Sequence, residues 1–230
     1  MISGANRGIG KAIAERLHQA GCRLSLGARD PDKLARDIAG SMDTGRVLIH
    51  PYEARDRNVA NEWASATVEK YGCIDGLVNN AAIVHLFRAE DENEELLDEM
   101  WDVNVKGPLR LFRAAFPHLK DCGHGRVINI SSLSGVRLNW PEVAGYAMTK
   151  HALMAFTHAI KFSGWEFGIR STAICPAFVN TDMTLDVPGV SPAEMIQPES
   201  IAELVETVLA LPNTASVTEL PVNCLLEHSY

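Results

Sequence analysis

A glycine-rich turn near the start of the chain constrains the fold more than any other segment. Gly4, Gly8 and Gly10 follow the spacing G-x-x-x-G-x-G, and residues 11–17 continue with apolar side chains at helical spacing. Glycines between a strand and a helix let the backbone approach a pyrophosphate, and the helix N-terminus supplies free N–H groups and a partial positive charge. The turn therefore predicts a phosphate-binding site at the start of the first helix.

Short apolar strands alternate with helical segments over the rest of the chain. We predict strands over residues 22–28, 47–53, 74–82, 125–132, 170–176 and 220–226, helices over residues 58–71, 90–119, 146–163 and 201–211, and a loop or short lid over residues 177–198. This alternation implies right-handed βαβ units and a parallel sheet. The predicted fold class is α/β, a single-domain, Rossmann-like, doubly wound parallel sheet flanked by helices over residues 1–230. Because only Met1 and Ile2 precede the turn, we expect the start of the first strand to be missing.

Charge and cysteine content limit the expected partners and setting. The net charge is -8 and no local run of Lys and Arg offsets it, which argues against binding to nucleic acid or to an anionic membrane. The five cysteines include no Cys-x-x-Cys pair, and an odd number cannot close a disulfide framework. We therefore expect a reducing, cytoplasmic setting and assign no metal ligands. No apolar run approaches the ~20 residues that cross a bilayer, so the expected partners are small molecules or copies of the chain.

Two arginines favour a cofactor that carries a 2′-phosphate. At the end of the strand predicted over residues 22–28, a carboxylate would accept hydrogen bonds from a ribose 2′-hydroxyl, but the chain has Ala28 followed by Arg29. Arg7 in the glycine-rich turn is a second cation within reach of such a phosphate. The alternative is that both arginines are solvated surface residues.

Tyr146 and Lys150 form the candidate proton-transfer pair. They are four residues apart in a predicted helix and project from the same face. A phenol has a pKa near ~10, and a neighbouring cation lowers that pKa by stabilising the phenolate. Ser132 ends a predicted strand, where ligands bind in open parallel sheets, and is placed to orient a substrate oxygen. Asn104 interrupts an apolar helical pattern and needs a hydrogen-bonding reason.

With these motifs placed, the sequence resembles the short-chain dehydrogenase/reductase family over nearly its whole length. Residues 3–10 are similar to the family's T-G-x-x-x-G-x-G, with Ser3 in the Thr position. Residues 80–82 are similar to its N-A-G, with Ala82 in place of Gly. The remaining matches are the catalytic Ser at Ser132, with Gly135 three residues on, the Y-x-x-x-K pair at Tyr146 and Lys150, and the helix Asn at Asn104 in Asn-Val-Lys-Gly.

The resemblance implies hydride transfer between a nicotinamide and a carbonyl carbon, with a role for each catalytic residue. Tyr146 would be the general acid in carbonyl reduction and the base in alcohol oxidation. Lys150 would lower the pKa of Tyr146 and hold the nicotinamide ribose. Ser132 would bind the substrate oxygen, and Asn104 would anchor a water that links Lys150 to solvent. The resemblance also implies a homotetramer or homodimer built on the long helices that contain Asn104 and Tyr146.

NADP is the cofactor that the resemblance implies for a chain with arginines at these positions. Its expected binding residues are Ser3, Gly4, Asn6, Arg7, Gly8, Ile9, Gly10, Arg29, Glu53, Ala54, Asn80, Ala81, Ala82, Tyr146, Lys150, Pro176, Val179 and Thr181. Two positions depart from the family pattern. Glu53 stands where many members have Asp near the adenine, and Ala177 replaces the Gly of a Pro-Gly pair before Thr181. These departures concern local cofactor geometry and leave the catalytic set complete.

The expected substrate pocket is mostly apolar. Its predicted lining is Val84, His85, Leu86, Leu138, Asn139, Trp140, Phe178, Met183 and Leu185. Such a lining favours a small to medium aldehyde, ketone or secondary alcohol that is neutral or weakly polar. Two alternatives stay open. A dehalogenase-type lyase on this fold uses Ser and Tyr without hydride but carries Arg in place of Lys150, and a non-catalytic NADP-binding sensor or scaffold usually loses the Tyr or the Lys.

Overall fold

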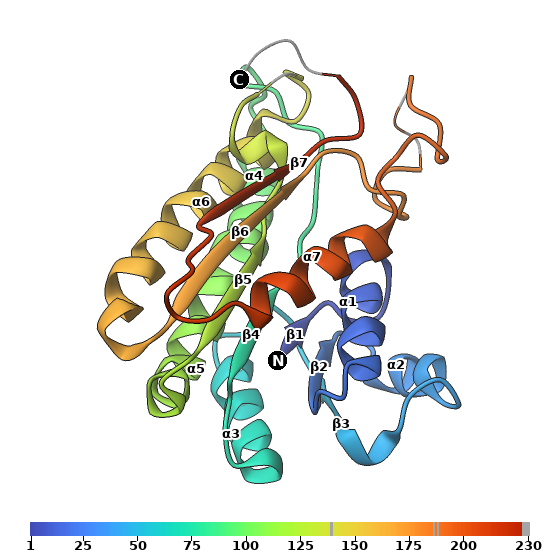
Figure 1. Cartoon of the computed structure of the whole chain (residues 1–230). Coiled ribbons are helices and arrows are strands. Elements are labelled where there is room, and N and C mark those ends of the chain that lie inside the picture. Colours follow the sequence, from blue (N-terminus) through green and yellow to red (C-terminus); the bar gives the residue numbers. More distant parts are fainter. Residues whose placement is uncertain (139, 186, 188, 227–230) are drawn as a thin grey trace.

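The computed structural model describes the chain except residues 139, 186, 188 and 227–230, and its described part contains one sheet of seven parallel strands (Figure 1). The strands are β1 Ile2–Ser3, β2 Leu24–Ala28, β3 Val47–Pro51, β4 Gly76–Asn79, β5 Arg126–Ile130, β6 Arg170–Pro176 and β7 Glu219–Val222. Their spatial order is β3-β2-β1-β4-β5-β6-β7. The order reverses between β1 and β4, and ligands bind at such a reversal in open α/β sheets. The predicted fold class is confirmed.

Helices cover both faces of the sheet (Figure 1). They are α1 Gly8–Gln19, α2 Pro31–Ile38, α3 Val59–Tyr71, α4 Glu94–Trp101, α5 Gly107–Cys122, α6 Ala144–Gly164 and α7 Pro198–Ala210, with shorter turns η1 Thr44–Arg46, η2 Asp102–Lys106, η3 Leu133–Gly135 and η4 Trp165–Phe167. One face carries α1, α2 and α7, and the other carries α3, α5 and α6. No helix in the described part of the chain is long and apolar enough to cross a membrane.

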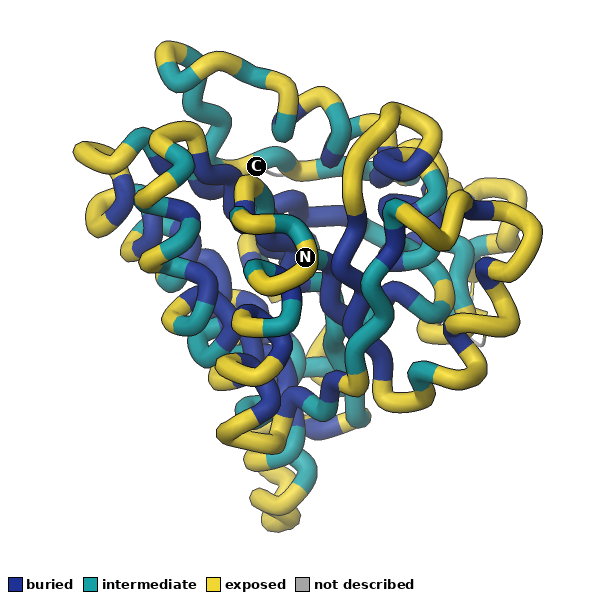
Figure 2. The backbone as a smooth tube through the Cα atoms, turned by 90° about the horizontal axis from the view of Figure 1, so that it is seen from below, coloured by how far each residue is buried: buried dark blue, intermediate teal, exposed yellow. Residues whose placement is uncertain are grey.

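Side chains of the central strands alternate between two cores. In β4, Leu77 packs with α3 and α5, whereas Val78 packs with α1 and α7. In β5, Val127 packs on the side of α3 and α5, and Ile128 packs on the side of α1 and α7. Because successive side chains of a strand point to opposite faces, a strand covered on both sides is apolar throughout. The sheet is therefore the buried centre of the molecule, and exposed residues gather on loops and on the outer sides of helices (Figure 2).

Local signals set several element boundaries. Asp30 caps α2, because its carboxylate accepts a 2.8 Å hydrogen bond from the backbone N of Lys33. Gly72 ends α3 in the left-handed conformation at φ 80°. Both signals act over only a few residues of sequence. The strand predicted over residues 74–82 is shorter, spanning Gly76–Asn79, because Asn80 turns its side chain to the ends of β1 and the glycine-rich turn.

The long acidic helix predicted over residues 90–119 is formed by α4, η2 and α5 in direct succession. It starts later than predicted, at Glu94, where Asn93 caps it by accepting a hydrogen bond from the backbone N of Glu95. The middle turn η2, which contains Asn104, has the wider π-helical form. Single π-helical turns inside helices often occur at functional sites, and this one turns Asn104 toward the end of β4.

Candidate active site

The glycine-rich turn forms a bare helix N-terminus at the carboxyl edge of the sheet. Gly4 has a φ of 68°, which favours glycine. A Cβ on Gly10 would lie 2.3 Å from the Gly4 carbonyl oxygen and 2.4 Å from the side-chain N of Asn80, so only glycine permits this approach. Arg7 occupies the N-cap position of α1 without capping it by a side-chain hydrogen bond. The N–H groups in the first turn of α1 are therefore suited to an anion such as a pyrophosphate.

Ser3 and Asn80 tie the ends of β1 and β4 together. Ser3 Oγ accepts hydrogen bonds from the backbone N of Asn80 at 3.0 Å and of Ala81 at 3.1 Å. Asn80 Nδ2 donates to the carbonyl oxygens of Ser3 at 3.0 Å and Gly4 at 3.1 Å. The sequence predicts Asn80 among the cofactor residues, and in this structure its amide holds the glycine-rich turn in place. The remaining predicted residues around this turn, Asn6, Ile9, Ala81 and Ala82, are half-buried.

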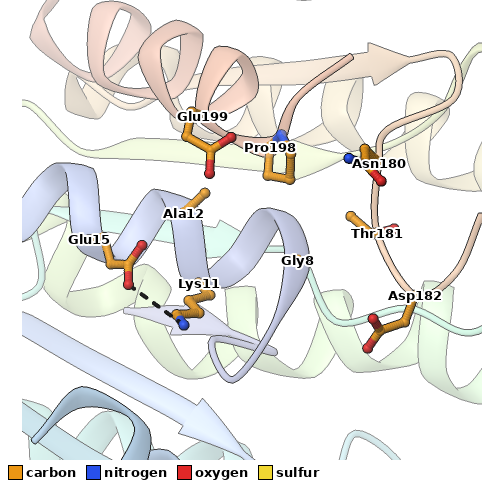
Figure 3. Close-up of a pocket in the computed structure, with 9 residues that line it drawn as sticks. All are labelled: Gly8, Lys11, Ala12, Glu15, Asn180, Thr181, Asp182, Pro198 and Glu199. Carbon is orange, nitrogen blue, oxygen red and sulfur yellow. Dashed lines mark ion pairs between the residues drawn. The ribbon is translucent and has the colours of Figure 1, made fainter. Parts of the chain in front are cut away.

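A polar cavity of about 260 Å³ lies beside this turn (Figure 3). It opens between the first turns of α1 and α7, with Gly8 and Lys11 on one side and Thr181 and Asp182 on the other. The cavity adjoins the predicted phosphate site. None of the catalytic residues predicted from the sequence lines it.

The two arginines expected at a 2′-phosphate are both exposed. Arg29 follows β2 directly, as predicted. Arg7 pairs with Asp182 at 3.0 Å, and the two side chains are 60% and 62% exposed. Such exposed pairs contribute little stability, so Arg7 can exchange Asp182 for a phosphate at little cost.

The other predicted cofactor residues lie where β3 and β6 end. The Glu53 carboxylate accepts a 3.2 Å hydrogen bond from the backbone N of Arg55 and pairs with its guanidinium at 3.4 Å. Ala54 is buried beside it. Pro176 is the last residue of β6, Val179 is buried, and the backbone N of Thr181 donates to Thr184 Oγ1 at 3.3 Å.

Ser132, Tyr146 and Lys150 meet at the carboxyl end of β5. Ser132 follows β5 by two residues and shares a side-chain hydrogen bond with Tyr146. Lys150 is 2% exposed, and its Nζ lies 5.4 Å from the centre of the Tyr146 ring. The same Nζ donates a 2.8 Å hydrogen bond to the carbonyl oxygen of Ile130, the last residue of β5. The three residues therefore form one group, although Ser132 is distant in sequence from the other two.

Burial sets the pKa values of this group. It raises the pKa of Tyr146 to about 12, with the hydrogen bond from Ser132 acting in the opposite direction. It lowers the pKa of Lys150 to about 8. The sequence predicted that Lys150 would lower the pKa of Tyr146, whereas in this structure the lowering influence is the hydrogen bond from Ser132, and burial outweighs it. The Tyr146 phenol is therefore neutral at neutral pH, and the Lys150 ammonium loses its proton more readily than an ordinary lysine.

Asn104 has the hydrogen-bonding reason that its position in an apolar helix required. Its Oδ1 accepts from the backbone N of Ile83 at 2.9 Å, and its Nδ2 donates to the carbonyl oxygen of the same residue at 2.9 Å. Nδ2 also donates to Thr149 Oγ1 at 3.1 Å. Thr149 is the neighbour of Lys150, so Asn104 connects the segment after β4 to the helix that carries the candidate catalytic pair.

Several of the residues predicted to line the substrate pocket are apolar and partly or fully exposed. The rings of Trp140 and Phe178 lie 5.5 Å apart. Leu86, Leu138, Met183 and Leu185 are large apolar residues with exposed side chains. His85 is turned to an acidic partner, with its Nε2 2.9 Å from Glu99 Oε2, and Asn139 lies outside the described residues.

Comparison with known proteins shows which family the chain resembles. Residues 1–188 match the family described as short chain dehydrogenase. The agropine synthesis reductase of Rhizobium rhizogenes is 41% identical over 230 residues, which make up 99% of this chain and 52% of that protein. The chain thus spans about half the length of this curated relative.

Two solved structures resemble the chain over nearly its full length. An alcohol dehydrogenase from the archaeon Thermococcus sibiricus, complexed with 5-hydroxy-NADP, is 30% identical with a TM-score of 0.87 and covers 100% of this chain and 97% of its own. A 3-ketoacyl-(acyl-carrier-protein) reductase from Brucella melitensis, complexed with NADH, has a TM-score of 0.88 at 24% identity, covers 97% of this chain and 95% of its own, and is similar in fold. The sheet order and the glycine-rich turn define a Rossmann-like protein. More narrowly, the chain belongs to the short-chain dehydrogenase/reductase family.

Proposed function

We propose that the protein is an NADP-dependent oxidoreductase that interconverts a carbonyl compound and its alcohol. One observation carries the proposal. Ser132, Tyr146 and Lys150 are grouped at the same edge of the sheet as a glycine-rich turn suited to a pyrophosphate. A proton donor beside a dinucleotide site is the arrangement that hydride transfer to a carbonyl requires.

The residues of the chain fit this cofactor at three places. The uncapped start of α1 is suited to the pyrophosphate. Arg29 and Arg7 would bind the 2′-phosphate, and Lys150 would hold the nicotinamide ribose. When bound, NADP(H) supplies or accepts the hydride. The alcohol dehydrogenase of T. sibiricus was complexed with 5-hydroxy-NADP and the reductase of B. melitensis with NADH, so the preference for NADP rests on the two arginines.

Tyr146 is the residue that moves the proton. In reduction its hydroxyl gives the proton to the substrate oxygen as the substrate carbon gains a hydride, and in oxidation its phenolate takes that proton back. Ser132 holds the substrate oxygen by a hydrogen bond. Lys150 in its charged form stabilises the phenolate. Asn104 keeps Thr149 and therefore Lys150 in place, beside the water that would connect Lys150 to solvent.

The proposed substrate is a neutral or weakly polar aldehyde, ketone or secondary alcohol of small to medium size. The tilted ring pair of Trp140 and Phe178 and the exposed leucine and methionine side chains of the predicted lining support this class, because desolvating an apolar substrate against them is favourable. A relative named as a reductase and a neighbour named as an alcohol dehydrogenase are consistent with it.

The proposal is tested with a panel of carbonyl compounds and alcohols that includes bulky members, with NADPH absorbance as the readout. We expect turnover with NADPH and little with NADH. Tyr146→Phe should abolish turnover and keep NADPH affinity within about twofold, because it removes one hydroxyl and leaves the ring. Unchanged turnover in this variant would remove Tyr146 from the proton transfer.

The same panel separates the two alternatives. Halide release from a haloalcohol without nicotinamide would favour the dehalogenase-type lyase, although Lys150 stands where such proteins carry Arg. NADPH binding without turnover on any compound would favour a sensor or scaffold.

We also propose a single domain that works as a homodimer or homotetramer in the cytoplasm. The end of α6 and the turn η4 that follows it expose three large aromatic side chains, Phe162 at 78%, Trp165 at 43% and Phe167 at 41%. Exposed apolar surface of this kind marks an interaction site, which supports assembly through the long helices. Light scattering on Phe162→Glu compared with the unaltered chain tests it, and equal masses at the monomer value would contradict it.

A further inference from the structure

Side chains that can bind a metal ion gather at the edge of the sheet opposite the candidate active site. The ligand atoms of Asp75, Cys122 and His124 all lie within 4.8 Å of one another. Cys73 adds a second thiol, because its Sγ lies 3.6 Å from Asp75 Oδ2. We propose that Cys73, Asp75, Cys122 and His124 bind a Zn²⁺ ion.

The backbone holds the two halves of this site in register. Gly72 ends α3 and Gly123 ends α5, both with positive φ, so Cys73 and His124 each follow a sharp helix end. The backbone N of Arg126 donates a 2.9 Å hydrogen bond to the carbonyl oxygen of Asp75, where β4 and β5 begin side by side. The two turns are therefore fixed to each other by the sheet before any metal binds.

The ligand atoms of Asp75, Cys122 and His124, all within 4.8 Å of one another, approach the spacing of a tetrahedral zinc site. Zn–S bonds are about 2.3 Å and Zn–N bonds about 2.0 Å, so tetrahedral ligand atoms lie about 3.3–3.8 Å apart. His124 Nε2 is 3.9 Å from Asp75 Oδ1. Asp75 and His124 are exposed and Cys73 and Cys122 are half-buried, so a metal ion has direct access from solvent.

The ligand chemistry selects the metal. Two thiols, one imidazole and one carboxylate favour Zn²⁺ over Mg²⁺ or Ca²⁺, which prefer oxygen ligands. Arg23 Nη2 lies 3.7 Å from Cys73 Sγ, and burial and the neighbouring Asp75 carboxylate raise the pKa of the Cys73 thiol, so a bound Zn²⁺ ion would have to displace its proton. The site joins the turn after α3 to the turn after α5, far from Tyr146, and a bound ion would act as a cross-link that stabilises the folded chain without taking part in hydride transfer.

The experiment uses the full chain, reduced and treated with a chelator, and titrates it with Co²⁺ and then Zn²⁺. Bound Co²⁺ should show the visible bands of tetrahedral coordination and a thiolate charge-transfer band in the near ultraviolet, and Zn²⁺ should displace it and raise the Tm. Cys122→Ser and His124→Ala should each weaken Zn²⁺ binding by about 100-fold, the upper end of what loss of a supporting group causes. Mg²⁺ should not displace Co²⁺.

Cys224→Ser is the matched control, because Cys224 lies beyond β7 and packs against the core on the α1 side of the sheet. It should bind Zn²⁺ like the unaltered chain. Cys73→Ser removes the fourth proposed ligand. It therefore tests the thiol contribution to Zn²⁺ binding even if Cys122→Ser disturbs folding. Absence of the thiolate band, equal Zn²⁺ affinity in Cys122→Ser and Cys224→Ser, or recovery of Cys73 and Cys122 as a disulfide in the freshly purified chain would each overturn the proposal.

Discussion

The Nζ of Lys150 donates a 2.8 Å hydrogen bond to the carbonyl oxygen of Ile130. This bond anchors the ammonium beneath the carboxyl end of β5, 5.4 Å from the centre of the Tyr146 ring. The ammonium is thus held by a strand end and not by a carboxylate. Because a neutral carbonyl compensates little of the cost of burying a charge, the pKa of Lys150 falls to about 8.

Lys150→Met should flatten the rise of stability with pH between about 8 and about 10.5. The folded pKa of Lys150 is about 8, below its ordinary value of 10.5. In that interval the unfolded chain binds more protons at this residue, so the free energy of unfolding rises with pH. Methionine has a similar length and no charge. Urea unfolding of both proteins without cofactor measures the two slopes.

The slope of the free energy of unfolding against pH must be compared between the two proteins, because Tyr146 and Cys175 change that free energy in the opposite direction to Lys150. Burial raises the pKa of Tyr146 to about 12 and that of Cys175 to about 11. As the pH rises past the ordinary pKa of each group, that group lowers the free energy of unfolding. Their effect is present in both proteins, so the difference reports on Lys150. Identical slopes would contradict the buried, weakly compensated ammonium.

Arg29→Asp should reverse the preference for NADPH over NADH. A carboxylate after β2 repels a 2′-phosphate and accepts hydrogen bonds from a free 2′-hydroxyl. Loss of a hydrogen bond to a charged group costs about 1.5–3 kcal/mol, which weakens NADPH binding by about 10- to 100-fold. Fluorescence titration with each cofactor measures the change. Arg36→Asp, an exposed site in α2, makes the same charge change and should leave the preference intact.

Gly10→Ala should weaken NADPH binding by at least about tenfold. A displacement of about 1 Å in a group that contacts a ligand strongly reduces how well that ligand is held. The new Cβ would meet the Gly4 carbonyl oxygen at 2.3 Å and force the glycine-rich turn away from α1. Calorimetric titration with NADPH checks the affinity, and circular dichroism at the same temperature checks that the chain is folded. A folded variant with unchanged affinity would show that this turn does not hold the cofactor.

Gly27→Ala should destabilise the fold by about 1–3 kcal/mol, the usual cost of overpacking a core. A Cβ at Gly27 would lie 2.5 Å from the ring of Trp63, which is fully buried and donates a 2.8 Å hydrogen bond to Ser25 Oγ. Gly76→Ala is the control, because its Cβ would meet its nearest neighbour at 3.8 Å. Urea unfolding should separate the two variants, and equal midpoints would be evidence against a rigid Trp63.

Local sequence patterns predicted most helices and strands because their causes are local. Asp30 caps α2 and Gly72 ends α3 through contacts within a few residues. The strand predicted over residues 170–176 matches β6. Boundaries that depend on distant residues were less accurate, as at Asn80, where contacts with β1 end the predicted strand early.

The candidate catalytic group was predicted by residue identity, but its geometry was not. Spacing places Tyr146 and Lys150 on one helix face. The contacts of Asn104 with Ile83 and Thr149 depend on a π-helical turn, which the amino-acid pattern around Asn104 does not predict.

The sequence by itself determined the parallel α/β fold, the glycine-rich turn before α1 and the helical pair Tyr146 and Lys150, because these follow from spacing along the chain. The tertiary structure alone decided how deeply Lys150 is buried, and so the direction of its pKa shift. It also brought Cys73 and Cys122 to neighbouring strand starts. Burial and encounters between distant residues depend on how the sheet is assembled, and that assembly has no local signature in the sequence.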